Sequence, residues 1–261
     1  MKTTFPTPLS DEAVRTFHEV GFIVVRGLFA AAEVAELAAG FDALEAMART
    51  LSGTQLHAGS QFVLGDDPDG EGVGGAIQRV VWCGAAVPRL GALGCDPRLV
   101  AIAGRLLGAS TMDQLINQAH FKRPGDGVAF PWHQDSRHRR YGTPVWRDVN
   151  GRGSFVEMVT AVDPVTTENG PLELVPHSAR LGHVMTDPGT KSLPSGVFDP
   201  TTAIAPELAP GDAVLFGPYT IHGSRPNQST RPRRAFLNGF AYPGANTRVY
   251  PGDGAGRRLS L

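Results

Sequence analysis

The hydrophobic pattern of residues 1–50 predicts a helix, a strand and a second helix. Apolar residues at helical spacing follow Ser10, whose side chain can cap a helix, and Gly21 is placed to end this helix. Residues 22–26 read Phe-Ile-Val-Val-Arg, a β-branched run that is typical of a strand. Residues 30–50 are rich in Ala, Leu and Glu, with apolar positions again at helical spacing.

The next segment has no clear periodicity. Residues 53–75 are rich in Gly and Asp, and we expect them to form a mobile loop that could act as a lid. The spaced glycines of residues 70–75 fit a dinucleotide-binding pattern, but no predicted strand leads into them and no predicted helix follows, so we reject that interpretation. Residues 96–107 return to a helical pattern.

After residue 109 short apolar runs alternate with turn sequences such as Pro-Gly-Asp and Glu-Asn-Gly, which predicts consecutive short strands. The 32 glycines and 21 prolines, about a fifth of the 261 residues, suit such a chain. We therefore expect one mainly β domain with flanking helices, a helix-rich part over 1–108 and a sandwich or jelly-roll core over 109–245. The predicted strands are 115–122, 155–162, 172–175, 213–216 and 235–242.

Charge and cysteine content narrow the classes of function. The 24 Lys and Arg residues nearly balance 25 Asp and Glu, for a net charge of −1, which argues against nucleic acid or a membrane surface as partner. The apolar runs are too short to span a bilayer, and the N-terminus lacks a secretory pattern. The two cysteines, Cys83 and Cys95, form no disulfide framework and read as small apolar residues. These features predict a cytoplasmic protein.

The segment Trp-His-Gln-Asp carries the first candidate chemistry. On a strand His133 and Asp135 would point to the same face and could offer an imidazole and a carboxylate to one metal ion. The best candidate for a third ligand is His222, just after the predicted strand 213–216. Two histidines and one carboxylate leave one side of a metal open, as in iron(II) oxygenases. A histidine in a strand is, however, often only a hydrogen-bonded structural residue.

A candidate anion site follows the third histidine. Arg233 lies eleven residues after His222, and a guanidinium can clamp a carboxylate through two parallel hydrogen bonds. Ser224 shares strand parity with His222 and could add a hydroxyl to that carboxylate site.

Several of these motifs occur in a particular order along most of the chain: His133-Gln134-Asp135, Glu168-Asn169-Gly170, Pro210-Gly211-Asp212, His222-Gly223-Ser224 and Arg233. In this order the chain resembles the phytanoyl-CoA dioxygenase family, which includes the ectoine hydroxylases. The resemblance implies a double-stranded β-helix (jelly-roll, cupin-like) core that uses iron(II), 2-oxoglutarate and O2. It also implies that His133, Asp135 and His222 are the iron ligands, and that Arg233 with Ser224 holds the distal carboxylate of 2-oxoglutarate.

The resemblance also directs attention to the strand before the first histidine. Gln118 and His120 share one face of the predicted strand 115–122, together with Lys122. We expect Gln118 and His120 to lie near the keto-acid end of 2-oxoglutarate. The competing interpretation is the solvent-facing side of an edge strand.

The chain departs from the family pattern in two places. Residues 176–179 read Pro-His-Ser-Ala where the family typically has Pro-Gly-Ser-His, which puts the local turn in question. A long segment, residues 136–154, separates Asp135 from the next predicted strand and contains Arg137, Arg139 and Arg140. These arginines could receive an acidic group of the substrate, although solvated charges on a loop are an equal reading. Together with residues 53–75, this segment could cover the reaction.

The function that these observations predict is hydroxylation of an unactivated C–H bond of a small molecule, an amino acid or a secondary-metabolite intermediate. In related halogenases a small residue replaces the carboxylate ligand, so Asp135 favours hydroxylation. Desaturation, epoxidation or cyclisation by the same cofactors stays open, as do a non-oxidative cupin-type metalloenzyme and a binding module. The sequence does not separate a monomer from a homodimer.

Overall fold

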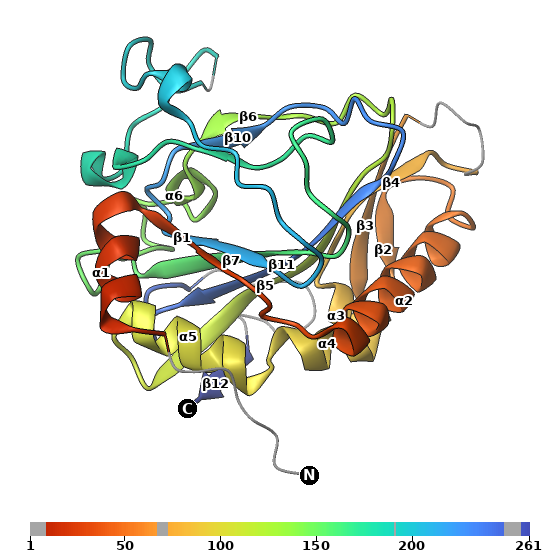
Figure 1. Ribbon diagram of the computed structural model, residues 1–261, viewed down its shortest axis with the longest axis horizontal. Coiled ribbons are helices and arrows are strands. Elements are labelled where there is room, and N and C mark those ends of the chain that lie inside the picture. The colour runs from red at the N-terminus through yellow and green to blue at the C-terminus, as the bar shows by residue number, and fades with distance from the viewer. Residues whose placement is uncertain (1–8, 67–72, 191, 248–256) are drawn as a thin grey trace.

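A large and a small antiparallel β-sheet lie one above the other in the computed structural model, which describes residues 9–66, 73–190, 192–247 and 257–261 (Figure 1). Among these residues the large sheet has nine strands and the small sheet three. The large sheet runs in the order β1 (Phe22–Val25), β9 (Ala213–Phe216), β7 (Phe155–Ala161), β11 (Arg233–Ala241), β5 (Thr111–Lys122), β4 (Ala76–Val81), β3 (Ser60–Gly65), β2 (Gln55–His57), with β12 (Arg257–Ser260) also on β5. The small sheet runs β6 (Phe130–His133), β10 (His222–Ser224), β8 (Glu173–Leu174).

Helices cover the face of the large sheet that points away from β6 and β10 (Figure 1). Phe41 on α2 packs against Phe121 of β5 and Phe236 of β11, with ring centroids 5.1 and 6.5 Å apart. Because side chains alternate along a strand, the neighbours of these phenylalanines point to the opposite face, toward the small sheet. The helices are α1 (Asp11–Val20), α2 (Ala31–Ala48), α3 (Cys83–Ala86), α4 (Pro88–Gly94), α5 (Pro97–Leu107) and α6 (Asp135–His138), with 3₁₀ turns η1 (Ser178–Leu181) and η2 (Pro200–Thr202).

The helix ends show why the local sequence forms these helices. The Ala13 amide donates to Ser10 Oγ at 3.1 Å before α1, and Gly21 ends that helix with φ at 98°. The Arg98 amide donates in the same way to Asp96 at the start of α5. The predicted order of helix, strand and helix over the first fifty residues is therefore confirmed, as is the helix of 96–107.

The five strands predicted after residue 109 are also confirmed, with 213–216 matching β9 at both ends. The expectation of a loop over 53–75 was wrong, because β2 and β3 form a hairpin there and β4 follows. Phe62 is fully buried in the core and Leu64 packs against the same core, and together these two side chains anchor β3. Residues 67–72, which include part of the spaced-glycine pattern, lie outside the described residues.

The N-terminal part is thus less purely helical than predicted, since β1 to β4 all join the same large sheet as β5. The treatment of 1–261 as one domain stays a prediction. Cys83 is a free, fully buried thiol, as expected for a small core residue, and Cys95 is free and partly exposed. None of the helices in the described ranges combines the length and the apolar character needed to cross a bilayer.

Candidate functional site

Two histidines from distant parts of the chain face each other across the small sheet. His133 is the last residue of β6 and His222 the first of β10, and they are register partners in this antiparallel pair. Their ring centroids are 4.3 Å apart. The strand pairing therefore brings together two residues that lie 89 positions apart in the sequence.

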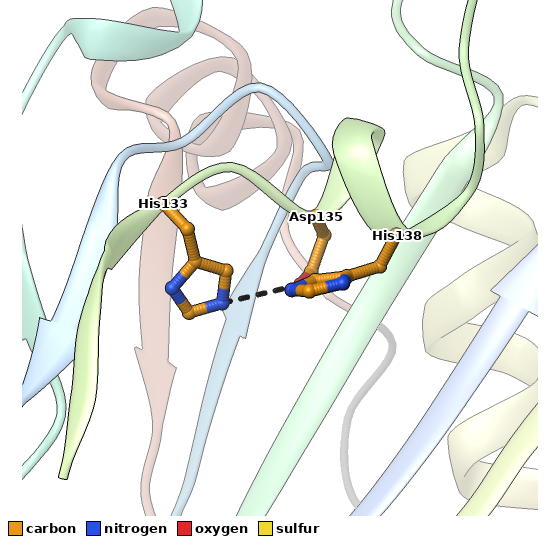
Figure 2. Close-up of side chains that lie close together, drawn as sticks. All are labelled: His133, Asp135 and His138. Carbon is orange, nitrogen blue, oxygen red and sulfur yellow. Dashed lines mark ion pairs between the residues drawn. The ribbon is translucent and has the colours of Figure 1, made fainter. Parts of the chain in front are cut away.

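Asp135 reaches the same point by a route that differs from the prediction. The strand ends at His133, Gln134 is extended, and Asp135 is the first residue of the short helix α6. The expectation that His133 and Asp135 share one strand was therefore wrong. Their side chains nevertheless converge, because the Asp135 Oδ1 lies 3.7 Å from His133 Nε2 and 3.8 Å from His222 Nε2. The turn into α6 carries the carboxylate back toward the strand end (Figure 2).

Backbone carbonyls orient both imidazoles. His133 Nδ1 lies 2.7 Å from the carbonyl oxygen of Pro131, and His222 Nδ1 lies 2.9 Å from that of Thr220. A carbonyl oxygen only accepts, so each Nδ1 carries the proton and each Nε2 presents a lone pair. This arrangement of a ligand nitrogen with its partner nitrogen fixed is typical of metal-binding histidines.

The protonation states suit a metal ion. Burial, then the charge of His133, lowers the pKa of His222 to about 4, so its imidazole is neutral at pH 7. Burial alone would raise the pKa of Asp135, but His222, Arg139 and His133 together hold it below its usual value. The carboxylate oxygen of Asp135 thus lies less than about 4.2 Å from each Nε2 atom, and 4.2 Å is twice the length of a typical bond between a histidine and a divalent metal. The donor set fits a first-row divalent ion such as iron(II).

A third histidine lies beside this group and was not singled out from the sequence. His138, on α6, has its ring centroid 5.1 Å from that of His133. The ligating atoms of His133, Asp135 and His138 all lie within 4.8 Å of one another (Figure 2). His138 sits one helical turn after Asp135, and this i, i+3 spacing was the signal available in the sequence.

These side chains border a cavity of about 650 Å³ between the two sheets. Its lining includes every residue that the sequence nominated: His133, Asp135, His222, Arg233, Ser224, His120 and Gln118. Further lining residues that the sequence reasoning did not select are Arg79, Phe130, Trp132, His138 and Glu157.

Arg233 is a buried cation with spare donors. Arg233 is the first residue of β11, and its Nη2 donates to the carbonyl oxygen of Gly170 at 2.7 Å. Its Nε is buried and has no hydrogen-bond partner among the described residues. Burial lowers the pKa of Arg233 to about 10, so the guanidinium stays charged at neutral pH. A buried guanidinium with an unpaired N–H that lines a cavity fits a carboxylate ligand.

Ser224 is held in place by Lys122, a residue whose role the sequence did not reveal. Lys122 is 1% exposed, and its Nζ donates to Ser224 Oγ at 2.7 Å and also to the Arg225 carbonyl oxygen. Burial, then repulsion from Arg233, lowers the pKa of Lys122 to about 7. The signal for this residue was its shared parity with Gln118 and His120 on one strand.

His120 and Gln118 lie on the cavity face of β5. This strand lies between β11 and β4, so the competing interpretation of an edge strand was wrong. The His120 Nε2 is 3.0 Å from Gln118 Oε1, and the imidazole stacks on Phe130 with centroids 5.5 Å apart. Burial, with the nearby cations Arg79, Arg233 and Lys122, lowers the pKa of His120 to about 3. His120 is therefore neutral.

The segment between Asp135 and β7 divides its arginines between two environments. Arg137 and Arg139 line the cavity, and the Arg139 guanidinium carbon lies 4.9 Å from the centroid of Phe155. Arg140 is exposed, which agrees with the alternative interpretation of solvated charges on a loop. The departure from the family pattern at residues 176–179 also has a structural counterpart. His177 occupies a left-handed conformation, with φ at 63°, at the position where the family has a glycine.

Comparison with known proteins agrees with the geometry. The model of the family described as phytanoyl-CoA dioxygenase (PhyH) matches residues 17–235. The chain belongs to this family. It is therefore an oxygenase of the non-haem iron and 2-oxoglutarate-dependent class, and the resemblance read from the motifs is confirmed.

Individual relatives are distant. The chain is 30% identical over 168 residues to L-proline trans-4-hydroxylase of Streptomyces griseoviridis, covering 54% of this chain and 58% of that protein. It is 29% identical over 248 residues to ectoine dioxygenase of Bordetella parapertussis, covering 88% and 74%. The crystal structure of EctD from S. alaskensis superimposes with a TM-score of 0.71 at 23% identity, covering 96% and 83%. This last likeness confirms the jelly-roll fold.

Proposed function

We propose that this chain hydroxylates an unactivated C–H bond of a small molecule, an amino acid or a secondary-metabolite intermediate, with iron(II) held by His133, Asp135 and His222. The observation that carries the proposal is the convergence of two Nε2 atoms and one Oδ1 atom at 3.7 to 3.8 Å on the wall of a cavity that also contains Arg233. The relatives named for proline hydroxylation and for ectoine oxidation support a free small molecule as substrate.

The protein's part in metal binding is to fix three ligands and leave the remaining positions open. The carbonyl oxygens of Pro131 and Thr220 hold the two imidazoles, and Asp135 supplies one negative charge. Iron(II) held there would supply O2 activation coupled to the oxidative decarboxylation of 2-oxoglutarate to succinate and CO2, which drives oxidation of the substrate. Because Asp135 is retained, we infer hydroxylation and not halogenation.

Arg233 would hold the distal carboxylate of 2-oxoglutarate. Its unpaired Nε and its Nη2 are fixed by burial and by the Gly170 carbonyl oxygen, so the guanidinium loses little freedom when it binds. Ser224 would donate its hydroxyl proton to the same carboxylate, since its oxygen already accepts from Lys122. Gln118 and His120 would lie near the keto-acid end.

The substrate would enter from the side of α6 and the following segment. Arg137 and Arg139 line that part of the cavity and would receive an acidic group of the substrate. Gln61 of β3 also lines the cavity, so the hairpin of β2 and β3 would help to exclude water. We propose a cytoplasmic location on the basis of the free Cys83 and Cys95.

The test begins with anaerobic protein and iron(II). Addition of 2-oxoglutarate should produce a weak visible charge-transfer band, and in air the protein should release succinate with some members of a panel of amino acids and small metabolites. If the wild-type protein gives no band, a non-oxidative metalloenzyme or a binding module becomes the better explanation. Mass spectrometry of the oxidised product then separates a gain of one oxygen from desaturation or cyclisation.

A further inference from the structure

A second carboxyl group lies in the cavity, outside the three proposed metal ligands. Glu157 is in the middle of β7, with Phe216 of β9 and Gly239 of β11 as register partners on its two sides. It lines the cavity and is only 4% exposed. Its Oε2 is buried and has no hydrogen-bond partner among the described residues. The fold thus places an unsatisfied acceptor on the cavity wall.

A buried acceptor of this kind is unfavourable unless a hydrogen-bond donor satisfies it. A buried polar atom without a hydrogen bond destabilises a protein, and native proteins rarely contain one without a reason. The usual reasons are a bound ligand or a role in chemistry. Burial and the nearby charge of Asp135 raise the pKa of Glu157 to about 8, and Arg139 offsets only part of this effect. A cation brought close to Oε2 would favour the ionised carboxylate.

The neighbours of Glu157 define what could approach it. Ile116, Val159 and Leu237 line the same cavity and offer apolar surface for a carbon skeleton. Among the described lining residues, Asp135 and Glu157 are the acidic ones, and Asp135 is assigned to the metal. Arg79, Arg137 and Arg139 also line the cavity and can attract an anion. Apart from the groups assigned to the metal or to 2-oxoglutarate, the cavity therefore contains one carboxyl group and three guanidinium groups.

We propose that Glu157 binds a protonated amine of the primary substrate, and that the substrate is a zwitterion whose carboxylate faces the cavity arginines. This inference rests on the proposed oxygenase function and specifies its substrate class. The amine donates to Glu157 Oε2 and satisfies the buried acceptor. Glu157 and Asp135 line the same cavity, so an amine held by Glu157 places the substrate in the cavity that contains the proposed metal site.

Titration calorimetry tests the proposal without turnover. The anaerobic wild-type protein, loaded with iron(II) and 2-oxoglutarate, is titrated with the protein amino acids, each paired with its N-acetyl derivative, in which the α-nitrogen carries no charge. At least one free amine should bind, and its paired analogue should bind tenfold or more weakly. The variant Glu157→Gln, which keeps the size of the side chain, should bind that amine at least tenfold more weakly than wild type, about 1.4 kcal/mol.

The controls separate this inference from the function on which it rests. Glu45→Gln removes a half-buried carboxyl on α2, outside the cavity, and should bind the amine as wild type does. The charge-transfer band of Glu157→Gln should equal that of wild type, which shows an intact iron and 2-oxoglutarate site. Equal amine affinity in Glu157→Gln and wild type overturns the role of Glu157, as does equal affinity for amines and analogues, or no binding by any amine. A missing band in wild type instead overturns the oxygenase function.

Discussion

His133 and His222 are register partners at the adjoining ends of β6 and β10, with ring centroids 4.3 Å apart. The distance between them is set by backbone hydrogen bonding between two strands, and each ring is further fixed by a carbonyl oxygen. The proposed metal site is therefore preorganised, and little reorganisation should accompany binding of the ion.

The first prediction concerns the metal ligands. His222→Ala or Asp135→Ala should abolish the visible band that iron(II) and 2-oxoglutarate produce, because two remaining ligands bind a divalent ion weakly. Iron content after anaerobic gel filtration should fall in parallel. His57→Ala is the matched control, since His57 lies on β2, is exposed and does not line the cavity. A full band in His222→Ala would contradict the assignment.

The second prediction concerns the anchor of 2-oxoglutarate. Arg233→Ala should raise the concentration of 2-oxoglutarate needed for half-maximal band intensity roughly 10- to 100-fold, as expected for loss of charged hydrogen bonds worth about 1.5–3 kcal/mol. The maximal band should survive at high concentration, because the metal ligands are untouched. Arg231→Ala, two residues away and exposed, should behave as wild type. An unchanged half-saturation in Arg233→Ala would show that the diacid binds elsewhere.

The third prediction concerns Gly170, whose carbonyl oxygen accepts from Arg233. Its φ is +72°, and an added Cβ would lie 2.4 Å from the Arg225 carbonyl oxygen and 3.1 Å from Lys122 Nζ. Gly170→Ala should therefore destabilise the protein and weaken 2-oxoglutarate binding, measured by thermal unfolding and by the band titration. Gly182→Ala, with φ at +62° and no atom within 4 Å of the added Cβ, isolates backbone strain from crowding. Equal 2-oxoglutarate affinity in both variants would argue against a role for Gly170 in placing Arg233.

The fourth prediction concerns Asp212 in the Pro-Gly-Asp turn before β9. Its carboxylate accepts from the Gly27 amide at 2.8 Å and from the Ala209 amide at 3.0 Å, and it pairs with Arg26 at 2.7 Å. Burial alone would raise the pKa of Asp212, but these hydrogen bonds hold it below the usual 3.8. Asp212→Asn should lower the free energy of unfolding by about 1–3 kcal/mol at pH 7.

The pH dependence of this difference has a definite sign. A carboxyl whose pKa is lower in the folded state contributes its stability above the unfolded pKa and loses it as the pH falls through the folded pKa. The difference in the free energy of unfolding between wild type and Asp212→Asn should thus have its full value at pH 7 and decrease below pH 3.8. Urea unfolding at several pH values measures it, with Glu19→Gln on the exposed side of α1 as the control. A gap that does not change with pH would mean that the charge of Asp212 is not what stabilises the turn.

The amino-acid sequence was sufficient to predict most of the helices and strands and the identity of the candidate ligands. Local periodicity and turn residues were enough for α1, α5 and the strands after residue 109, because each of these patterns repeats over several residues. The order of the motifs was enough for the family, and hence for the jelly-roll fold. The hairpin of β2 and β3 was missed because its strands are short and lie among glycines and polar residues, so that the few apolar positions, such as Phe62 and Leu64, form no clear period.

The set of side chains that share the cavity became known from the three-dimensional structure. Asp135 joins the histidines from a helix and not from the predicted strand. The environments of Lys122 and Glu157 are set by residues more than 20 positions away in the sequence. Glu157 was visible in the sequence as a single acid within an apolar run. A strand pattern, however, shows only on which face of its own strand a residue lies. Which faces close on one another depends on sheet pairing, and pairing is a long-range property that local periodicity does not contain.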